Sequence, residues 1–422
     1  MEKVIFHIDV NSAFLSWEAA YRLKHLGATT DLREQVSAVG GSVEMRHGII
    51  LAKSIPAKKY NIKTGDSIME AKQKCPDVIL VPPNYGLYEK SSAAFMAILR
   101  QYTPDVEQYS IDEAYMDMTG MESLWGHPVA VAHMIKDRIY KELGFSVNIG
   151  ISSNKLLAKM AGDFKKPNLV HTLFPEEIPK KMWPLPVSDL FFVGHATTKK
   201  LHNLGIYTIE QLANADPNML RSHMKKHGEV VWSFANGLDF ASVLPVAPKQ
   251  KGYGNSTTIP YDVNNHRDAY IVLLALAETV SARLRKDAVK AEVISVGIKD
   301  YVFNYMSHQT VLMTSTNITK EIHKIACQLF NEAWNGIPIR HLGIHTSRIK
   351  DYDFTRQLNL FDTEDYPKLE YADIMVDTIR EKYGIDSIKR AVFLAGKIDH
   401  MSGGISREKR TVDYTILKIE NL

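Results

Sequence analysis

The sequence predicts an α+β protein with several domains. Its 422 residues are too many for one hydrophobic core and suit three or four domains. Over residues 1–164, short apolar runs alternate with amphipathic segments of helical period, which predicts a mixed sheet with helices packed on one face. A basic, helical segment follows over residues 165–240. A further set of strands and helices occupies residues 252–350.

The composition is that of an ordinary globular protein, with 45% hydrophobic and 23% charged residues. No apolar run reaches the length of a membrane span and no signal-peptide pattern is present, so we expect a cytoplasmic protein that does not contact a membrane. Cys75 and Cys327 are too few for a disulfide framework or a zinc site, and we expect both thiols to be reduced.

Basic residues are concentrated in the later segments, although the whole chain has a net charge of only +3. Residues 1–164 carry 18 Lys and Arg against 19 Asp and Glu. Residues 165–235 carry 9 against 6, and residues 245–355 carry 13 against 10. An acidic first part followed by two basic segments suits a metal-dependent site with attached modules that grip nucleic acid.

An adjacent acid pair, Asp112 and Glu113, lies in an alternating segment over residues 109–117, which predicts a half-buried strand of a hairpin. Neighbouring carboxylates need a compensating positive charge when buried, and Mg²⁺ prefers oxygen ligands. Taken alone, a solvated turn is the simpler interpretation. Asp9 favours the metal site over the solvated turn, because it follows a predicted buried strand at residues 4–8 and would complete a two-metal cluster.

Three motifs occur together in the first half of the chain. They are Asp-Val-Asn-Ser-Ala-Phe at residues 9–14, Tyr-Ser-Ile-Asp-Glu-Ala-Tyr-Met-Asp at residues 109–117, and Gly-Ile-Ser-Ser-Asn-Lys at residues 150–155 with Ala158 and Lys159. Together they resemble the Y-family of translesion DNA polymerases, and within it the UmuC-like bacterial branch most closely. The similarity continues, more weakly, to about residue 355.

The resemblance implies a right-hand polymerase with a small fingers domain and an additional little finger. The linker is also predicted from its own residues, since residues 244–251 contain prolines and lysines without periodicity. The expected parts are a palm (1–30 and 79–164), fingers (31–78), a helix-hairpin-helix thumb (165–240), a linker (241–251), an α/β little finger (252–350) and a C-terminal tail (351–422).

The resemblance also implies a two-metal mechanism of nucleotidyl transfer. Asp9, Asp112 and Glu113 would be catalytic and would hold two Mg²⁺ ions, with the backbone carbonyl of Val10 as a further ligand. One ion would lower the pKa of the primer 3′-OH for attack on a dNTP, with Glu113 as its expected ligand. The other would neutralise the leaving pyrophosphate.

Residues of the palm and fingers are expected to hold the dNTP. Phe14, which alone would be interpreted as a core residue, matches the aromatic that lies under the sugar and excludes a ribose 2′-OH. Ile55 and Lys58 replace a Tyr and an Arg that contact the phosphates in many members. Lys58 offers a point charge without the bidentate fork of Arg. The expected set is Asn11, Ser12, Phe14, Lys58 and Lys159.

The thumb and the little finger are expected to contact DNA. Residues 190–206 predict a helix, a short hairpin and a helix whose N-terminus meets a phosphate, although Ala196 replaces the usual second glycine. Without the upstream motifs, a helical spacer would explain this segment equally well. The expected DNA-binding residues are Gly194, Lys199, Ser256, Thr257, Thr258, Arg283 and Arg348, with Arg285 as a further candidate.

The tail contains Gln-Leu-Asn-Leu-Phe at residues 357–361, which resembles the bacterial peptide that binds the sliding clamp. Such a peptide docks in a groove of the clamp, and this tether raises the effective concentration of the enzyme at the DNA. The expected contacts are Gln357, Leu358, Leu360 and Phe361. Other SOS-response or replication proteins are further candidate partners. Residues 372–383 predict an amphipathic helix and residues 390–398 a strand, without a functional assignment.

Template-directed synthesis across damaged DNA is the function that the resemblance implies. Two alternatives stay open. A polymerase-like accessory protein would bind primed DNA and the clamp without catalysis. A helix-hairpin-helix nuclease or glycosylase would use residues 165–240 for DNA grip and would leave the motifs of residues 1–164 unexplained.

Overall fold

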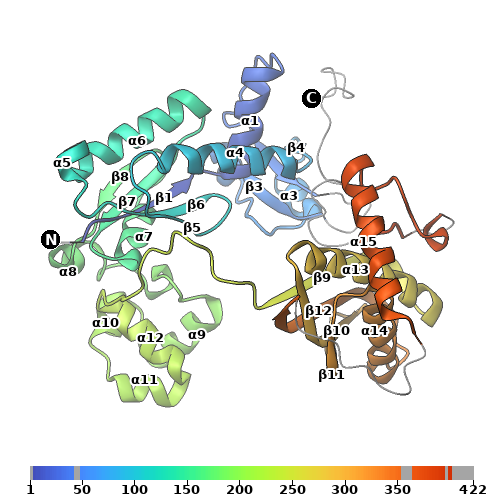
Figure 1. Cartoon of the computed structure of the whole chain (residues 1–422). Coiled ribbons are helices and arrows are strands. Elements are labelled where there is room, and N and C mark those ends of the chain that lie inside the picture. Colours follow the sequence, from blue (N-terminus) through green and yellow to red (C-terminus); the bar gives the residue numbers. More distant parts are fainter. Residues whose placement is uncertain (1–2, 42–47, 353–363, 395–397, 402–422) are drawn as a thin grey trace.

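The computed structural model of the chain describes residues 3–41, 48–352, 364–394 and 398–401. Figure 1 shows a large α/β part that contains the N-terminal half, a helical part below it, and a second α/β part at the far end of an extended connection. The predicted α+β class with several domains is confirmed. Among the helices of these residues, none is long and apolar enough to span a lipid bilayer.

The first α/β part is built on a mixed five-stranded sheet with the order β5-β6-β1-β7-β8. β1 (Ile5–Val10) lies in the middle and is antiparallel to both β6 (Glu113–Asp117) and β7 (Val147–Ser152). β5 (Val106–Gln108) and β8 (Val170–Thr172) form the edges, and β8 is parallel to β7. The strand that carries Asp9 is therefore the central strand, whose backbone is hydrogen-bonded to a neighbouring strand on each side.

Helices cover both faces of this sheet, so the prediction of a single covered face is wrong. On one face, alternate side chains of β1 pack with three helices: α1 (Ala13–His25), α4 (Tyr85–Leu99) and α6 (Pro128–Leu143). α7 (Lys155–Asp163) lies on the other face, where Ala158 packs against Ile5 and Tyr115. The apolar side chains of Ile5 and Tyr115 on this second face would be exposed to water if α7 did not cover them.

α7 lies very close to the sheet because two glycines leave room for it. A Cβ atom on Gly150 would lie 1.9 Å from the carbonyl oxygen of Ala158, and one on Gly162 would lie 3.1 Å from Nδ1 of His7. Real Cβ atoms do not tolerate the first of these distances, so any side chain at Gly150 would push α7 away from β7. The glycines therefore fix the height of α7 and its lysines above the sheet.

The fingers segment forms a separate small unit. Its three strands have the order β3-β2-β4: β3 (Ile50–Lys53), β2 (Ser37–Gly40) and β4 (Ile79–Val81). α2 (Ile55–Lys59) and α3 (Ile68–Lys74) complete its core. The hydroxyls of Ser54 and Ser67 accept hydrogen bonds from the first turns of α2 and α3, which is the usual way to satisfy helix N-termini.

The thumb segment contains five short helices around one hydrophobic cluster. They are α8 (Ile178–Lys181), α9 (His195–Asn203), α10 (Ile209–Ala213), α11 (Pro217–Met224) and α12 (Lys226–Ala235). The cluster includes Leu156, Leu157 and Met160 of α7, so the thumb packs directly on the helix that covers the palm sheet. The predicted helix before the hairpin is only a 3₁₀ turn, η2 (Val187–Asp189).

The second α/β part has a four-stranded antiparallel sheet with the order β11-β10-β12-β9 and two helices packed on one face, as predicted. Residues 239–251, which lead to it, have no helix or strand. The six elements are β9 (Gly252–Val263), α13 (His266–Lys286), β10 (Val289–Asp300), β11 (Tyr305–Thr316), α14 (Thr319–Ala333) and β12 (Ile339–Asp351).

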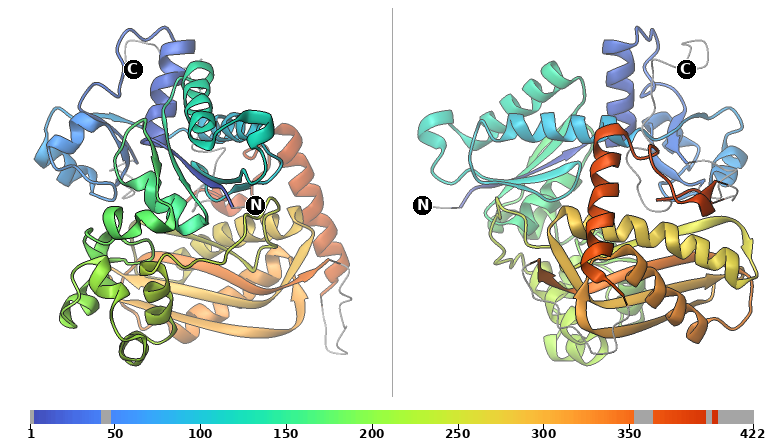
Figure 2. Two further views of the ribbon diagram at one scale, coloured as in Figure 1. Left: turned by 90° about the vertical axis from the view of Figure 1, so that its left-hand side faces the viewer. Right: turned by 45° about the vertical axis from the view of Figure 1, so that its right-hand side comes forward.

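A further helix, α15 (Tyr366–Tyr383), packs on this domain beside α13 (Figure 2). Arg285 of α13 pairs with Asp377 at 2.6 Å and with Asp373 at 3.2 Å. The sequence places these acids in a tail beyond the little finger, whereas they cover one of its helices. The predicted strand at residues 390–398 is wrong, because its described part forms the 3₁₀ turn η3 (Ala391–Phe393).

Candidate active site

β1 and β6 bring the three predicted acids to the same end of the central sheet. Asp9 lies directly opposite Glu113 in the antiparallel register. The N–H of Val10 donates to the carbonyl oxygen of Asp112 at 3.0 Å. All three acidic residues are half-buried. Residues about a hundred positions apart therefore converge, as the hypothesis of a metal cluster requires.

Asp112 does not lie in a strand, because residues 109–112 form a tight turn and β6 begins only at Glu113. The hydroxyl of Ser110 accepts hydrogen bonds from the N–H groups of Asp112 and Glu113, at 3.3 and 3.0 Å. It donates to Oδ1 of Asp112 at 2.6 Å. Serine hydroxyls stabilise turns in this way. The alternation that predicted a longer strand therefore includes a turn, and this turn orients the acid pair.

Two lysines supply positive charge to the acids. Nζ of Lys159 lies 2.8 Å from Oε1 of Glu113. Nζ of Lys166 contacts Oδ2 of Asp9 and lies 2.8 Å from Oδ1 of Asp163. Lys166 is not among the residues predicted from sequence. The run Lys165-Lys166-Pro167 directly after α7 is the signal that could have drawn attention to it.

The carboxylates of Asp9 and Glu113 contact these lysines, and that of Asp112 accepts from Ser110. Within the described residues, the ligand atoms of Asp9, Asp112 and Glu113 do not all lie within 4.8 Å of one another. The strands bring the three residues together, but the side chains do not form a closed ligand set. A cation at this site would have to replace the ammonium groups as the partner of the acids.

Asp9 and Glu113 differ in their titration although they are neighbours. Burial raises the pKa of Asp9, and the charge of Lys166 only partly offsets this effect. Burial acts in the same direction on Glu113, but the imidazole of His7 and the ammonium of Lys159 outweigh it and lower the pKa of Glu113 to about 2. Of these two acids, Asp9 is therefore the one whose negative charge is less well compensated.

Buried polar atoms near the acids have no hydrogen-bond partner within the described part of the chain. They are Oδ1 of Asn11 and both ring nitrogens of His7. Asn11 is held in place, since its amide Nδ2 donates to Oγ of Ser146 at 3.2 Å. Nε2 of His7 lies 3.9 Å from Oε2 of Glu113. A buried amide oxygen without a partner, two residues after Asp9, is of the kind that hard cations prefer as a ligand.

Phe14 lies at the start of α1, two residues after the left-handed backbone of Ser12 (φ 49°, ψ 49°). Its ring is stacked on Tyr88 of α4, with ring centroids 4.5 Å apart and an interplanar angle of 6°. The ring packs against the core while remaining partly exposed, so its contact with a nucleotide sugar stays a prediction.

The fingers bring two lysines together. Lys58 is exposed on α2, and Ile55 at the start of that helix is 48% exposed. Burial and the nearby charge of Lys58 lower the pKa of Lys53, with Asp66 acting against them. Two ammonium groups that repel each other form a surface suited to an anion.

The thumb residues predicted to bind DNA lie on one helix, Gly194 at its N-cap and Lys199 near its middle. Gly194 is the N-cap of α9, and space is open around it. Lys199 is exposed on the same helix. Thr197 of α9 is linked to His227 of α12 by a contact of 3.2 Å between Oγ1 and Nε2, so the N-terminal turns of two helices lie side by side. Such N-termini are favourable positions for phosphates.

The residues predicted in the little finger do not form one surface. Ser256 and Thr258 alternate with the buried Asn255 and Ile259, so they lie on the sheet face away from the helices, and Thr257 points the other way. Arg283 donates to the carbonyl of Gly254 at 3.0 Å. Arg348 is exposed on β12.

Arg285 is not available to DNA, because its guanidinium lies in the ion pairs with Asp373 and Asp377 and its side chain is only 7% exposed. The clamp-binding residues Gln357, Leu358, Leu360 and Phe361 lie outside the described residues, so their assignment stays a prediction.

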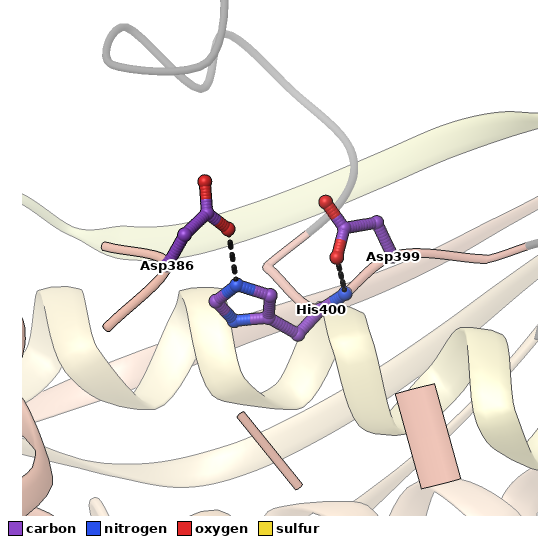
Figure 3. Close-up of side chains that lie close together, drawn as sticks. All are labelled: Asp386, Asp399 and His400. Carbon is purple, nitrogen blue, oxygen red and sulfur yellow. Dashed lines mark hydrogen bonds and ion pairs between the residues drawn. The ribbon is translucent and has the colours of Figure 1, made fainter. Parts of the chain in front are cut away.

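A second group of potential metal ligands lies at the end of the described chain: Asp386, Asp399 and His400 (Figure 3). Nε2 of His400 lies 2.9 Å from Oδ1 of Asp386. Lys389 already pairs with Asp386 at 2.8 Å and Asp399 at 3.3 Å. Because the lysine compensates both acids, we interpret this group as an ion-pair cluster that holds the last segment on α13.

Comparison with known proteins agrees with this geometry. A solved Y-family DNA polymerase chimera aligns with a TM-score of 0.70 at 21% sequence identity, covering 82% of this chain and 99% of that chain. The fold is therefore that of a right-hand polymerase with a little finger, as predicted. Sequence models of the impB/mucB/samB family, its C-terminal domain and the IMS family HHH motif match residues 8–163, 250–360 and 175–206.

Curated relatives align over nearly the whole chain. DNA polymerase IV of Clostridium acetobutylicum is 44% identical over 398 residues, which cover 93% of this chain and 99% of that protein. DNA polymerase IV of Acetivibrio thermocellus is 38% identical, covering 93% and 98%. DNA polymerase IV 1 of Bacillus subtilis is 36% identical, covering 93% of each. The chain belongs to the impB/mucB/samB family of Y-family polymerases. The expected place in the UmuC-like branch is not confirmed, since these relatives are named DNA polymerase IV.

Proposed function

We propose that the protein is a template-directed DNA polymerase of the translesion type, which adds a dNTP to a primer 3′-OH on damaged DNA. The observation that carries this proposal is the register that places Asp9 opposite Glu113. The N–H of Val10, the next residue of β1, donates a hydrogen bond to the carbonyl oxygen of Asp112. Three acids on two central strands form a rigid site for phosphoryl chemistry. The relatives named DNA polymerase IV support the same activity.

The donor set fits divalent cations, for which we propose Mg²⁺. Asp9, Asp112 and Glu113 would be ligands, together with the backbone carbonyl of Val10, and the unpaired Oδ1 of Asn11 adds a further oxygen. Hard cations prefer such all-oxygen surroundings. When bound, two ions would activate the primer hydroxyl and neutralise the leaving pyrophosphate. Glu113 is ionised at neutral pH, and the charges of His7 and Lys159 beside it hold its pKa below its usual range.

Lys166 and Lys159 have different roles in this proposal. Lys166 contacts the buried carboxylate of Asp9 and would turn to the dNTP phosphates when Asp9 gains another cation. Lys159 contacts Glu113 and lies over the rings of Tyr109 and Phe191, so we assign it to the primer side. This assignment replaces Lys159 by Lys166 as the lysine of the palm that binds the triphosphate.

The incoming nucleotide would lie between α1 and the fingers. Phe14 would contact the sugar, with Asn11 and Ser12 beside it. Lys58, together with Lys53, would contact the phosphates. Lysine point charges bind phosphate with less geometric selection than an arginine fork. We therefore expect weaker discrimination by triphosphate geometry than in relatives with an arginine at position 58.

Primer–template DNA would be held through its phosphates by the thumb and the little finger. Gly194 is the exposed N-cap of α9, and Lys199 is exposed on the same helix. Ser256, Thr258 and Arg348 are accessible on the second domain. Thr257 and Arg283 are also proposed to contact DNA, although Thr257 points to the other face of the sheet and Arg283 donates to the carbonyl of Gly254. Contacts of this kind fix the position of a duplex without reading its sequence, as synthesis on any template requires.

The peptide at residues 357–361 would bind the sliding clamp of the replication machinery in the cytoplasm, and other SOS or replication proteins are possible targets of the same tail. Affinity for the clamp would raise the local concentration of the enzyme at a primer end. Replacement of Leu360 and Phe361 by Ala would remove the apolar anchors. It should abolish clamp-dependent stimulation and leave synthesis without the clamp unchanged.

One assay tests the central proposal against its alternatives. The protein is incubated with a labelled primed template, with Mg²⁺, and with or without dNTPs. Stepwise primer extension that requires dNTPs supports the polymerase. Binding of the primed DNA without extension would favour the accessory protein, and strand cleavage without nucleotides would favour a nuclease or glycosylase.

A further inference from the structure

The ring of Phe14 rests on a fully buried tyrosine from a different helix. Tyr88 of α4 is 0% exposed, and its ring is parallel to that of Phe14 within 6° at a centroid distance of 4.5 Å. Nothing in the motif at residues 9–14 indicates this contact, because Tyr88 lies 74 positions after Phe14 in the sequence. The surface of Phe14 that faces away from Tyr88 is the part available to a ligand.

Two further aromatic rings keep Tyr88 in place. Trp17, one turn after Phe14, has its ring centroid 5.8 Å from Tyr88 and 5.9 Å from Phe14. Tyr85 meets Tyr88 edge-on at 5.8 Å. The side chain of Asn84 caps α4 by accepting from Leu87, so the first turn that carries Tyr85 and Tyr88 is fixed. The side chains of Phe14, Trp17, Tyr85 and Tyr88 therefore form one aromatic cluster.

We propose that Tyr88 is a positioning residue that determines how strictly the polymerase excludes ribonucleotides. The inference rests on the proposed function, in which Phe14 lies under the sugar of the incoming nucleotide. A ring excludes a 2′-OH only when it cannot retreat from it. Tyr88 occupies the space into which Phe14 would otherwise move, and close-packed interiors resist such displacement. Selectivity then depends on a side chain that does not touch the nucleotide.

Substitutions of Tyr88 can distinguish the effect of its aromatic ring from the effect of its hydroxyl group. Tyr88→Leu removes the stacking surface and leaves space behind Phe14, whereas Tyr88→Phe keeps the ring. Tyr88→Met is a second variant without the ring, and its flexible side chain fills the space if Leu impairs folding. Thermal unfolding shows which variants fold. Phe14→Ala and the double variant Phe14→Ala, Tyr88→Leu complete a cycle that tests whether Tyr88 acts through Phe14.

The measurement is kcat/KM for insertion of a dNTP and of the matching rNTP on the same primed template. We expect Tyr88→Leu or Tyr88→Met to lower the dNTP/rNTP ratio of kcat/KM roughly three- to tenfold, the range for loss of one aromatic pair. Tyr88→Phe should keep the wild-type ratio. In the Phe14→Ala background, Tyr88→Leu should change the ratio less than twofold, roughly the limit of additivity between independent sites.

The outcomes distinguish this inference from the function on which it rests. If Phe14→Ala lowers the ratio but neither Tyr88→Leu nor Tyr88→Met does, the inference is overturned and the role of Phe14 stands. If Tyr88→Leu lowers the ratio equally with and without Phe14, Tyr88 does not act through that ring and the inference is also overturned. If Phe14→Ala leaves the ratio unchanged, the proposed role of Phe14 itself is wrong.

Discussion

Asp9 on β1 lies directly opposite Glu113 on β6, and the surroundings act on the two carboxylates in opposite directions. Glu113 has the imidazole of His7 and the ammonium of Lys159 beside it, which outweigh burial and lower its pKa to about 2. Burial dominates at Asp9 and raises its pKa, despite the contact with Lys166. The site therefore combines one acid that is fully compensated with one that is not, on a rigid pair of strands.

The first prediction concerns the two lysines. Lys166→Gln should raise the KM for dNTP by roughly tenfold or more, the range for loss of a hydrogen bond between charged groups. Lys159→Gln should instead lower kcat, because this lysine contacts Glu113. Steady-state insertion of a single nucleotide measures both constants. If both variants show the same change in kcat and the same change in KM, the division of roles between the lysines is wrong.

The second prediction concerns the helix that packs on the little finger. Arg285→Leu would remove the guanidinium that pairs with Asp373 and Asp377, while Arg390 stays 3.7 Å from Asp373. Breaking a buried ion pair in this way costs about 3–5 kcal/mol. Urea unfolding of the full chain, monitored by tryptophan fluorescence, should show this loss in the little-finger transition.

The matched control for that experiment is Lys320→Ala. Lys320 pairs with Glu364 at 2.8 Å, but its side chain is 56% exposed. Exposed pairs contribute about 1 kcal/mol or less. Equal destabilisation by Arg285→Leu and Lys320→Ala would contradict the conclusion that α15 is held by a buried network.

The third prediction concerns pH. Burial lowers the pKa of His323 below its ordinary value of 6.5; the hydrogen bond to the Tyr270 carbonyl acts against it, and the charge of Arg390 adds to it. The unfolded chain therefore takes up a proton at this histidine more readily than the folded chain. The contribution of His323 to stability is present above pH 6.5 and is lost as the pH falls below that value.

Thermal unfolding between about pH 7.5 and about pH 5.5 checks this sign, because an ordinary histidine titrates in that interval. The melting temperature of His323→Gln should fall less over the interval than that of the wild type. His195→Gln, at an exposed position, serves as the control and should follow the wild type. A steeper fall for His323→Gln than for the wild type would reverse the assigned sign.

Much of the fold could be predicted from sequence because its elements carry strong local signals. α13 and the strands of the second domain follow regular apolar periods, so a set of strands and helices could be placed within residues 252–350. The faces of the palm sheet could not be predicted in this way. The close packing of α7 depends on Gly150 and Gly162, whose significance appears only when the strand and the helix are superposed in space.

The site was predictable at the level of backbone but not of side chains. Asp9, Asp112 and Glu113 converge as expected, because the motifs lie at strand ends. The ammonium partners did not follow from spacing: Lys166 reaches Asp9 from a position 157 residues away. The predicted DNA contact of Arg285 is wrong for the same reason. Its acidic partners belong to α15, a helix that the sequence placed outside the domain.

The most direct test of the central claim is single-turnover primer extension by Glu113→Gln and Asp9→Asn. Each variant keeps the shape of the side chain and removes its charge. We expect the rate of nucleotide addition to fall roughly a thousandfold or more, while affinity for primed DNA stays within about twofold of the wild type. Asp117→Asn, at the opposite end of β6, is the control and should extend primers normally. Extension at a rate close to the wild type by Glu113→Gln or Asp9→Asn would contradict the assignment of these acids to catalysis.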